Sequence, residues 1–460
     1  MTQSHSITSL TVAFVAKLYR GTNSSIGMLH STLILRIMSS VATTIRGAAI
    51  ATLVAALGLS PGTAALANRD GRWVSSWADP AVSTVQAPSN QTVREIERIS
   101  LGGNWLRVRF SNEFNPAATV VGEAHIALAG LAGSTVPYSD RQLTFGGQSS
   151  ITIPPNAAVY SDPVRLAVPT LGSVAVSLFL PANAGMVTIH PAGIDTAYIT
   201  NGNTTAYSSP GGAVKSGMRY MLSEIQVLAD EDALAIVTLG DSITEGVGST
   251  TDDSHRWPDF LADRLAAAHG IGPRGVSNAG IGGNRVLNDN PPNPFFSFGE
   301  GALARLDRDV LAQAGVKYLI ILEGVNDLGL PGLVNVPQQT ITADQLIGAY
   351  RQIIARAHAH GIKVIGGTIT PFAGATEPNY WTPAGEAIRE AVNRFILKSG
   401  EFDGTIDFAA AIADPKKPTF MATQFSSGDG LHPNDAGYEA MATAIDLRLF
   451  KDFDRSVDRG

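Results

Sequence analysis

The sequence changes character near residue 233, and the pattern that follows is its strongest constraint on the fold. Apolar runs alternate there with amphipathic stretches of helical period. Buried strands that alternate with helices require a parallel sheet covered by helices on both faces, so we predict an α/β domain at residues 228–460. Strands are expected near 234–239, 275–279, 316–322, 362–369 and 404–408, and helices at 256–269, 301–314, 342–360, 382–398 and 435–449.

Residues 71–225 show a different pattern, with short alternating runs separated by Gly, Pro, Asn and Asp roughly every ten residues. The clearest strands are expected at 106–110 and 174–180, and no stretch of useful length has a helical period. We therefore predict an accessory domain of β-sandwich or jelly-roll-like type. It holds no cluster of candidate catalytic residues.

The first 67 residues form a leader of unusual composition. Residues 1–67 contain four basic residues and no Asp or Glu, and the apolar run 47–59 is followed by Ala65-Leu66-Ala67. This order is typical of a signal peptide cleaved after Ala67. A membrane anchor is the alternative, but about 13 apolar residues are fewer than the ~20 that span a bilayer. We expect export, secreted or periplasmic, without a stable membrane anchor; Met38 is an alternative start.

Composition excludes several classes of function. The sequence has no Cys, which rules out a thiolate metal site, a Cys nucleophile and disulfides. The formal net charge is −7, and cleavage of the basic leader would make it more negative. Such a balance disfavours nucleic acid or an anionic membrane as the main partner, so we expect no nucleic-acid partner.

A hydroxyl side chain follows the first expected strand, in residues 240–246 (GDSITEG). Ligands of parallel α/β sheets bind beyond the carboxyl ends of the strands, which makes Ser242 a candidate nucleophile. A helix N-terminus there would offer N–H groups to a developing oxyanion. By itself, the tripeptide Gly240-Asp241-Ser242 is more typical of a plain turn in which the serine caps a helix. We interpret Asp241 as organising that turn.

A second candidate group precedes the last expected helix. Asp429 and His432 are three residues apart, a step that can place both side chains on one side of a turn. In that arrangement Asp429 accepts the imidazole Nδ1–H and leaves Nε2 to deprotonate Ser242. The alternative is that Asp429 caps a turn and His432 is a surface residue.

Two more polar segments follow strands, at residues 278–284 (NAGIGGN) and 323–327 (EGVND). The Gly283 N–H and the Asn326 side-chain N–H are donor types that a tetrahedral oxyanion requires. Each segment alone is more often a tight turn.

Together, these four segments resemble the GDSL, or SGNH, hydrolase family, whose four sequence blocks occur in this order after the same strands. The resemblance covers residues 233–450, with Ile243 where the family name has Leu. It implies a flavodoxin-like three-layer domain with a five-stranded parallel sheet. In stretches such as residues 100–112 and 143–147, the β domain is similar, more loosely, to the N-terminal domain of secreted two-domain members. By the resemblance, Ser242 is the nucleophile, His432 the general base, Asp429 its orienting partner, and the oxyanion hole consists of Ser242, Gly283 and Asn326.

The implied activity is serine carboxylic-ester hydrolysis through an acyl-enzyme, which needs no cofactor. We expect short-chain or carbohydrate-borne acyl esters, so the partner is a small-molecule or polysaccharide ester. One alternative is a lipase or lysophospholipase, and another is an inactive glycan-binding protein. The intact set of Ser, Asp, His, Gly and Asn argues against the inactive protein.

Other residues are left without a role. His358 and His360 are two apart at a helix end, a poor spacing for a shared ligand, so we assign no metal site. An aromatic segment could line an acyl or aryl pocket, although packing against a loop is more usual, and the same holds for a later aromatic pair. These aromatic residues are Phe295, Phe296, Phe298, Tyr380 and Trp381.

Overall fold

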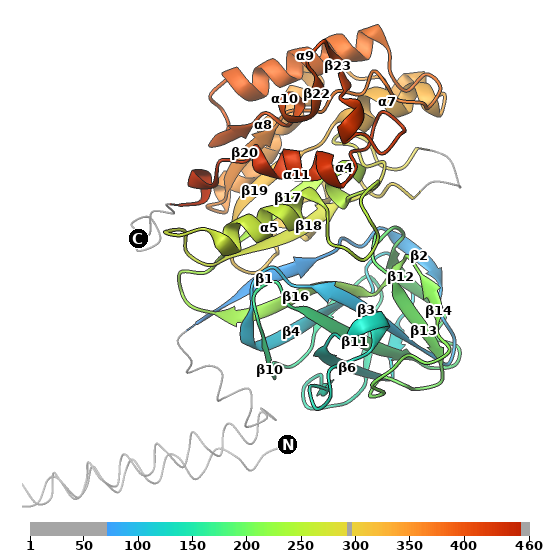
Figure 1. The fold of residues 1–460 in the computed structure, drawn as a ribbon. Helices are drawn as coiled ribbons and strands as arrows, with labels where there is room; N and C mark the ends of the chain where they lie inside the picture. Colours follow the sequence, from blue (N-terminus) through green and yellow to red (C-terminus); the bar gives the residue numbers. More distant parts are fainter. Residues whose placement is uncertain (1–70, 292–296, 452–460) are drawn as a thin grey trace, which may run out of the picture. The chain divides into compact units, whose positions relative to one another are not determined.

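The computed structural model of the chain describes residues 71–291 and 297–451. The described residues belong to one compact unit, in which a region of antiparallel β-sheets precedes a C-terminal α/β domain (Figure 1). Two expectations fall outside the described residues, the leader at 1–67 and the aromatic pair Phe295 and Phe296. In the described part of the chain, no helix has both the length and the apolar character needed to cross a membrane.

The β-rich region, residues 71–229, contains two large antiparallel sheets. One has the order β1-β16-β4-β10 with β9 on β4, the other β14-β13-β3-β11-β6-β7, and smaller sheets are β15-β12-β2 and β5-β8. Strand β4 shows why these segments are strands, because Leu106, Val108 and Phe110 are fully buried while the residues between them are partly exposed. The expected strands at 106–110 and 174–180 are confirmed as parts of β4 and β11.

The strands of this region have the following bounds: β1 (Arg72–Ala78), β2 (Ser83–Gln86), β3 (Gln91–Arg98), β4 (Gly103–Ser111), β5 (Thr119–Val121), β6 (Glu123–Leu128), β7 (Arg141–Leu143), β8 (Ile151–Ile153), β9 (Ala158–Tyr160), β10 (Val164–Val168), β11 (Ser173–Leu180), β12 (Met186–His190), β13 (Ala197–Asn201), β14 (Val214–Ser216), β15 (Arg219–Tyr220) and β16 (Leu222–Ala229).

The α/β domain is built on a five-stranded parallel sheet, as predicted. Its order is β18-β17-β19-β20-β21, and every neighbouring pair is parallel. This is the flavodoxin-like order, in which the first strand lies between the second and the third. The interior strand β17, between β18 and β19, is buried along its whole length, as expected for a strand covered on both faces. The bounds are β17 (Leu234–Gly240), β18 (Arg274–Gly280), β19 (Val316–Leu322), β20 (Lys363–Gly367) and β21 (Gly404–Ile406).

The helices of this domain follow the expected pattern with several differences, which include an unexpected short helix at Phe408–Ile412. The segment expected at 301–314 is helix α6 followed by a π-helical turn, and the one at 435–449 ends early, before a short 3-10 turn. Helix α7 was not expected, because Gly329 and Pro331 interrupt its pattern. Packing explains it, since the ring of Tyr380 occupies the space where a side chain at Gly329 would lie.

The helices have these bounds: α4 (Ser242–Glu245), α5 (Trp257–Ala267), α6 (Ala302–Leu306), α7 (Val325–Leu333), α8 (Ala343–Ala359), α9 (Pro383–Lys398), α10 (Phe408–Ile412) and α11 (Asp435–Thr443), and a hairpin of β22 (Ala413–Asp414) and β23 (Lys417–Met421) follows α10.

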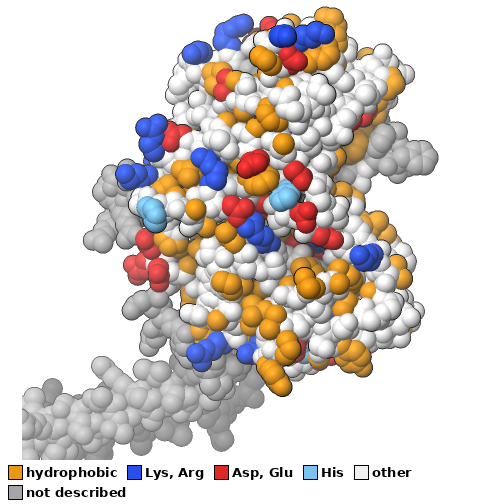
Figure 2. Space-filling model, viewed as in Figure 1, with side chains coloured by type: hydrophobic (Ala, Val, Ile, Leu, Met, Phe, Trp, Pro, Cys, Tyr) orange, Lys and Arg blue, Asp and Glu red, His pale blue; other side chains and the backbone are white. Residues whose placement is uncertain are grey.

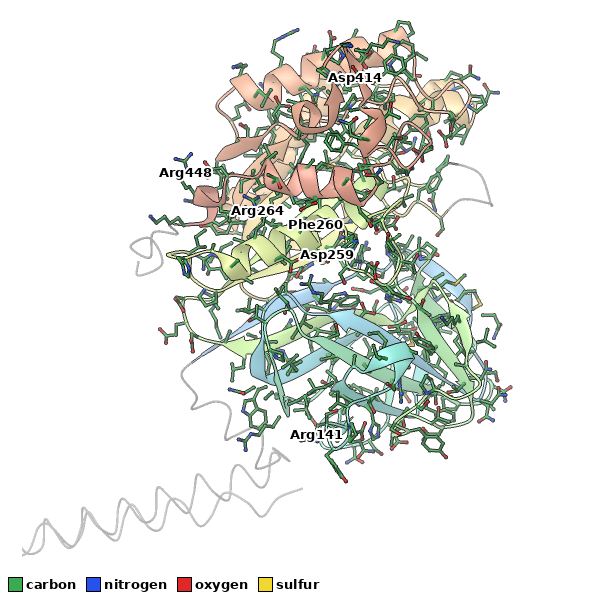
Figure 3. The ribbon with its side chains drawn as sticks, in the orientation of Figure 1. Arg141, Asp259, Phe260, Arg264, Asp414 and Arg448 are labelled. Carbon is green, nitrogen blue, oxygen red and sulfur yellow. The ribbon has the colours of Figure 1, made fainter. Side chains whose placement is uncertain are left out.

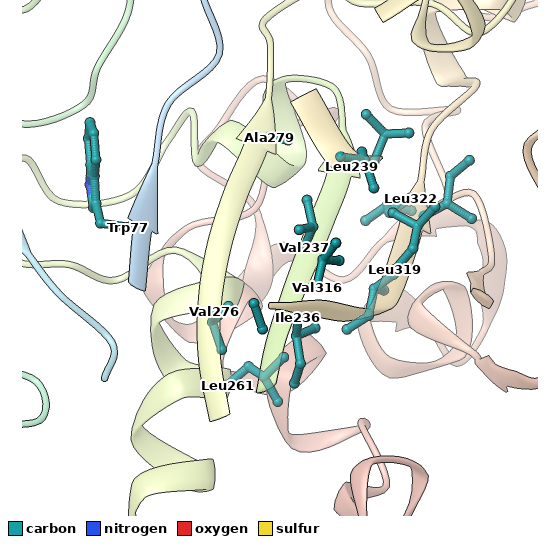
Figure 4. Close-up of a cluster of buried hydrophobic side chains, with 14 of the residues drawn as sticks. Trp77, Ile236, Val237, Leu239, Leu261, Val276, Ala279, Val316, Leu319 and Leu322 are labelled. Carbon is teal, nitrogen blue, oxygen red and sulfur yellow. The ribbon is translucent and has the colours of Figure 1, made fainter. Parts of the chain in front are cut away.

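Strand β1 of the β-rich region contacts the edge strand β18 of the parallel sheet. The Ser75 and Ser277 hydroxyls are 2.8 Å apart, and the Ser100 hydroxyl accepts the Val276 N–H at 2.8 Å. Trp77 is 6% exposed and belongs to the same buried cluster as the sheet's side chains, and Figure 4 draws it together with Val276, Val237 and Leu319. One hydrophobic core therefore extends across both parts of the described chain.

Surface charges of both signs are intermixed. On the face drawn in Figure 2, acidic and basic side chains lie near one another, and hydrophobic side chains form scattered groups. Exposed pairs such as Arg351 with Glu401 (2.7 Å) and Arg448 with Asp446 (2.6 Å) occur in the α/β domain. Water screens such pairs, so they add little to the stability of the fold.

Candidate active site

Ser242 lies where β17 turns sharply into the short helix α4. Asp241 is the N-cap of that helix, and its carboxylate accepts the Ile243 N–H at 2.9 Å. Burial raises the pKa of Asp241 to about 7. Asp241 thus organises the turn, as interpreted from the sequence. Ser242 is the first helical residue, so its N–H has no acceptor within the helix.

The structure brings Ser242, His432 and Asp429 together in one hydrogen-bonded chain. His432 Nε2 is 2.8 Å from Ser242 Oγ, and His432 Nδ1 is 2.6 Å from Asp429 Oδ2. Ser242 and His432 are 190 positions apart in the sequence. Because Nδ1 faces a carboxylate, the network assigns the ring proton to Nδ1 and leaves Nε2 to accept from the serine hydroxyl.

Asp429 is held as an anion. Its Oδ1 accepts the main-chain N–H groups of Leu431 and His432, both at 2.8 Å, while Oδ2 faces the imidazole. Partial burial opposes ionisation, but these hydrogen bonds outweigh it and hold the pKa of Asp429 well below its usual range. Asp429 therefore both caps a turn and orients His432, two roles that the sequence presented as alternatives.

Helix α11, which follows His432, is held by its own N-cap and by helix α5. Asn434 caps α11 by accepting the Gly437 N–H at 3.0 Å. At the other end, Arg264 of α5 donates to the carbonyls of Ala442 and Ile445. Arg264 and Phe260 lie along α5 in Figure 3. Helix α11 is thereby held at both ends, by Asn434 at the end that follows His432 and by Arg264 at the far end.

The predicted oxyanion donors lie at the carboxyl ends of three adjacent strands. Ser242 follows β17, Gly283 follows β18 and Asn326 follows β19. Gly283 has a φ of +71°, and a side chain there would collide with the ring of Phe298. Only glycine suits this position, because the left-handed backbone and the close ring both exclude a Cβ. Within the described residues, the Gly283 N–H donates no hydrogen bond to the protein.

Asn326 is oriented by Tyr380, a residue without an assigned role in the sequence. The Tyr380 hydroxyl donates to Asn326 Oδ1 at 2.7 Å, and both residues are buried. Asn326 Nδ2 is buried without a hydrogen-bond partner in the described part of the chain. A buried unpaired donor is unusual, and its natural use is to bind a ligand oxygen. No local signal links two residues that are 54 positions apart.

Arg305 was also missed by the sequence reasoning. Its buried guanidinium donates to the carbonyls of Gly240 (3.0 Å) and Ala279 (2.8 Å) and to Asn284 Oδ1 (3.0 Å). It thus ties the ends of β17 and β18 to the loop that contains Gly283. Asp327, after β19, accepts the Val286 N–H at 2.7 Å and so connects the end of β19 to the segment that follows Gly283. Burial raises the pKa of Asp327 to about 6.

The remaining candidates take separate partners. His358 contacts Asp403 at 2.7 Å, whereas His360 Nδ1 is 2.9 Å from the Arg356 carbonyl. The Trp381 indole N–H donates to Glu386 at 3.2 Å. No group of three or more His, Asp or Glu side chains in residues 71–291 and 297–451 is arranged to hold a metal ion.

Comparisons with known proteins find solved structures that are similar to part of this chain. One is a putative acylhydrolase from Bacteroides fragilis, with 22% identity over 47% of this chain and 86% of that one and a TM-score of 0.35. A second is a catalytic mutant of an acetylxylan esterase from Geobacillus stearothermophilus, with 20% identity over 47% of this chain and 94% of that one and a TM-score of 0.35. A third is the native aryl esterase of M. smegmatis, with 16% identity over 47% of this chain and 99% of that one and a TM-score of 0.37. A search of curated proteins finds no match.

The family model described as the GDSL-like Lipase/Acylhydrolase family matches residues 238–440. This span contains the end of β17, the strands β18 to β21, the turn with Ser242 and the His432 segment. The C-terminal half of the chain is therefore a GDSL-like lipase/acylhydrolase (SGNH) domain, preceded by an N-terminal β-rich region.

Proposed function

We propose that the chain is a serine carboxylic-ester hydrolase with Ser242 as nucleophile, His432 as general base and Asp429 as the partner of His432. The observation that carries this proposal is the hydrogen-bonded chain from Ser242 Oγ through the imidazole to Asp429, with spacings of 2.8 and 2.6 Å. A serine hydroxyl becomes nucleophilic when an adjacent base accepts its proton and a third group orients that base.

The reaction proceeds in two acyl transfers. Ser242 Oγ attacks the ester carbonyl carbon while its proton passes to His432 Nε2, and the oxyanion binds to the Ser242 N–H, the Gly283 N–H and Asn326 Nδ2. This attack forms a tetrahedral intermediate. When it collapses, the bond between the carbonyl carbon and the alcohol oxygen of the ester breaks, and His432 donates the proton to the leaving alcohol. Water, deprotonated by His432, then attacks the acyl-enzyme, and the carboxylic acid leaves as Ser242 regains its proton.

Short-chain or carbohydrate-borne acyl esters are the proposed substrates. The aromatic ring of Phe298 fills the space beside Gly283, which favours a small acyl group on that side of the nucleophile. A lipase or lysophospholipase activity would require room for a long acyl chain, and a substrate series distinguishes the two.

Export is proposed from the acid-free leader and Ala65-Leu66-Ala67.

The test compares the wild-type protein with Ser242→Ala on nitrophenyl esters of increasing chain length, acetylated polysaccharide and lysophospholipid. We expect turnover of the short esters, and a loss of at least ~10³-fold in the variant, the scale seen when a triad member is removed. A serine-directed phosphonate should add its mass to a peptide that contains Ser242. Undiminished activity of the variant, or labelling of another serine, would overturn the assignment, and an inactive wild-type protein would support the glycan-binding alternative.

A further inference from the structure

A buried carboxylate joins the two loops that carry Ser242 and Gly283. Glu245 is the last residue of α4, the helix that begins at Ser242, and it is 5% exposed. Its Oε1 accepts the Gly282 N–H at 3.0 Å. Gly282 directly precedes Gly283, so the position of Glu245 sets the position of this part of the loop.

The same carboxylate oxygen accepts a hydrogen bond from the β-rich region. His190, at the end of β12, has its Nε2 2.7 Å from Glu245 Oε1. Its Nδ1 is 2.8 Å from the Pro80 carbonyl and 3.1 Å from Asp79 Oδ1. Both ring nitrogens therefore face acceptors, an arrangement that only the doubly protonated, positively charged imidazole satisfies completely.

The charges around His190 favour this cation. Burial opposes it, but Asp79 and Glu245 outweigh the burial and raise the pKa of His190 to about 9. The two nearby arginines have carboxylate partners of their own, Glu97 for Arg219 and Asp259 for Arg256.

Glu245 therefore depends on His190 for the compensation of its charge. The other carboxylate oxygen, Glu245 Oε2, forms no hydrogen bond within the described residues. A buried carboxylate that lost its cationic partner would be free to rotate toward water, and this change would release the Gly282 N–H.

We propose that protonated His190 is a positioning residue for the hydrolase site, because it holds Glu245 and thereby fixes the Gly282–Gly283 segment for oxyanion binding. This inference rests on the proposed function. It assigns the β-rich region a part in turnover, in addition to its packing against β18. His190 itself touches no reacting atom and acts only through Glu245 and Gly282.

The experiment measures kcat and KM of the full chain for a short nitrophenyl ester in His190→Ala and His190→Gln. We expect kcat of His190→Ala to fall ~10-fold or more with KM within about twofold, because a displaced oxyanion donor matters most in the transition state. His190→Gln keeps an N–H donor without the charge, so it should recover part of the loss. The matched control is Arg98→Gln, which removes a contact with Asp263 of α5 but none with the loops at Ser242 and Gly283.

Two further readouts separate positioning from a general loss of stability. In the wild-type protein, kcat should fall as the pH rises through about 9, because the imidazole loses its proton there, and this decline should be absent in His190→Gln. Hydrogen exchange of peptides that cover residues 281–287 should be faster in both His190 variants and unchanged in Arg98→Gln. Circular dichroism and the melting temperature verify that each variant is folded.

An unchanged kcat in both His190 variants, an equal loss in Arg98→Gln, or exchange that speeds up everywhere would overturn this inference. These outcomes are distinct from a failure of the proposed function. If Ser242→Ala is inactive and the His190 variants are normal, only the positioning role is wrong. If Ser242→Ala stays active, the nucleophile is wrong, and the exchange rates still report whether His190 holds the loop.

Discussion

Removal of the Tyr380 hydroxyl tests whether Asn326 acts as an oxyanion donor with a fixed orientation. In Tyr380→Phe, Asn326 Oδ1 loses the hydrogen bond of 2.7 Å that distinguishes the two ends of its carboxamide. Such a bond contributes about 1 kcal/mol net, and 1.4 kcal/mol corresponds to a factor of ten. We therefore expect the preference for the productive orientation to fall about fivefold and kcat to fall about twofold, because about half of the molecules would then present the carbonyl instead of the N–H₂ group to the oxyanion.

Asn326→Ala removes the donor itself, and we expect kcat to fall ~10²- to 10³-fold with little change in KM. The double variant should be no worse than Asn326→Ala alone, because Tyr380 has nothing left to orient. A double-mutant cycle on a short nitrophenyl ester measures this non-additivity. The matched control is Tyr160→Phe, which removes the 2.8 Å hydrogen bond between a tyrosine hydroxyl and Glu224 in the β-rich region.

Three outcomes would refute this reasoning. Losses that multiply in the double variant would mean that Tyr380 acts independently of Asn326. A change confined to KM would make Asn326 a residue for substrate binding. An equal fall of kcat in Tyr160→Phe would indicate a general effect of hydroxyl removal on the fold.

Gly283→Ala should lower kcat at least ~10-fold in a folded protein, because the new methyl group meets the Phe298 ring at a φ of +71°; steady-state kinetics check this, and near-normal activity would contradict it. Residues 228–460 expressed alone should be insoluble or much less stable, because β18 loses its contacts with β1; solubility and thermal unfolding measure this, and a stable, fully active fragment would contradict it. The exported protein should begin at Asn68, as N-terminal sequencing would establish, whereas an intact leader in the membrane would favour an anchor.

Local sequence patterns were sufficient for the parallel sheet. The apolar run at 316–322 and its four counterparts were predicted within a few residues, because a buried strand must be apolar whatever surrounds it. The order of these strands came from the family resemblance. Helix α7 was missed because its glycines and Pro331 contradict a local helical pattern; in the structure the Tyr380 ring occupies the space where a side chain at Gly329 would lie.

The candidate site divides in the same way. Ser242, Asp429 and His432 could be singled out, because their segments stand after a strand or before a helix and, together with the segments of Gly283 and Asn326, resemble the four blocks of the GDSL family. Three residues that position the site could not be identified from the sequence. Tyr380 orients Asn326, Arg305 holds the ends of β17 and β18, and His190 contacts Glu245.

The physical reason is the range of the interactions. Strand and helix patterns report which face of a segment is buried, a property set by residues two to four positions apart. The partner of a buried polar group is chosen by whatever the fold brings within about 3 Å, from anywhere in the chain. The sequence by itself determined the sheet and marked the reactive groups, and the tertiary structure alone decided which side chains hold those groups in position.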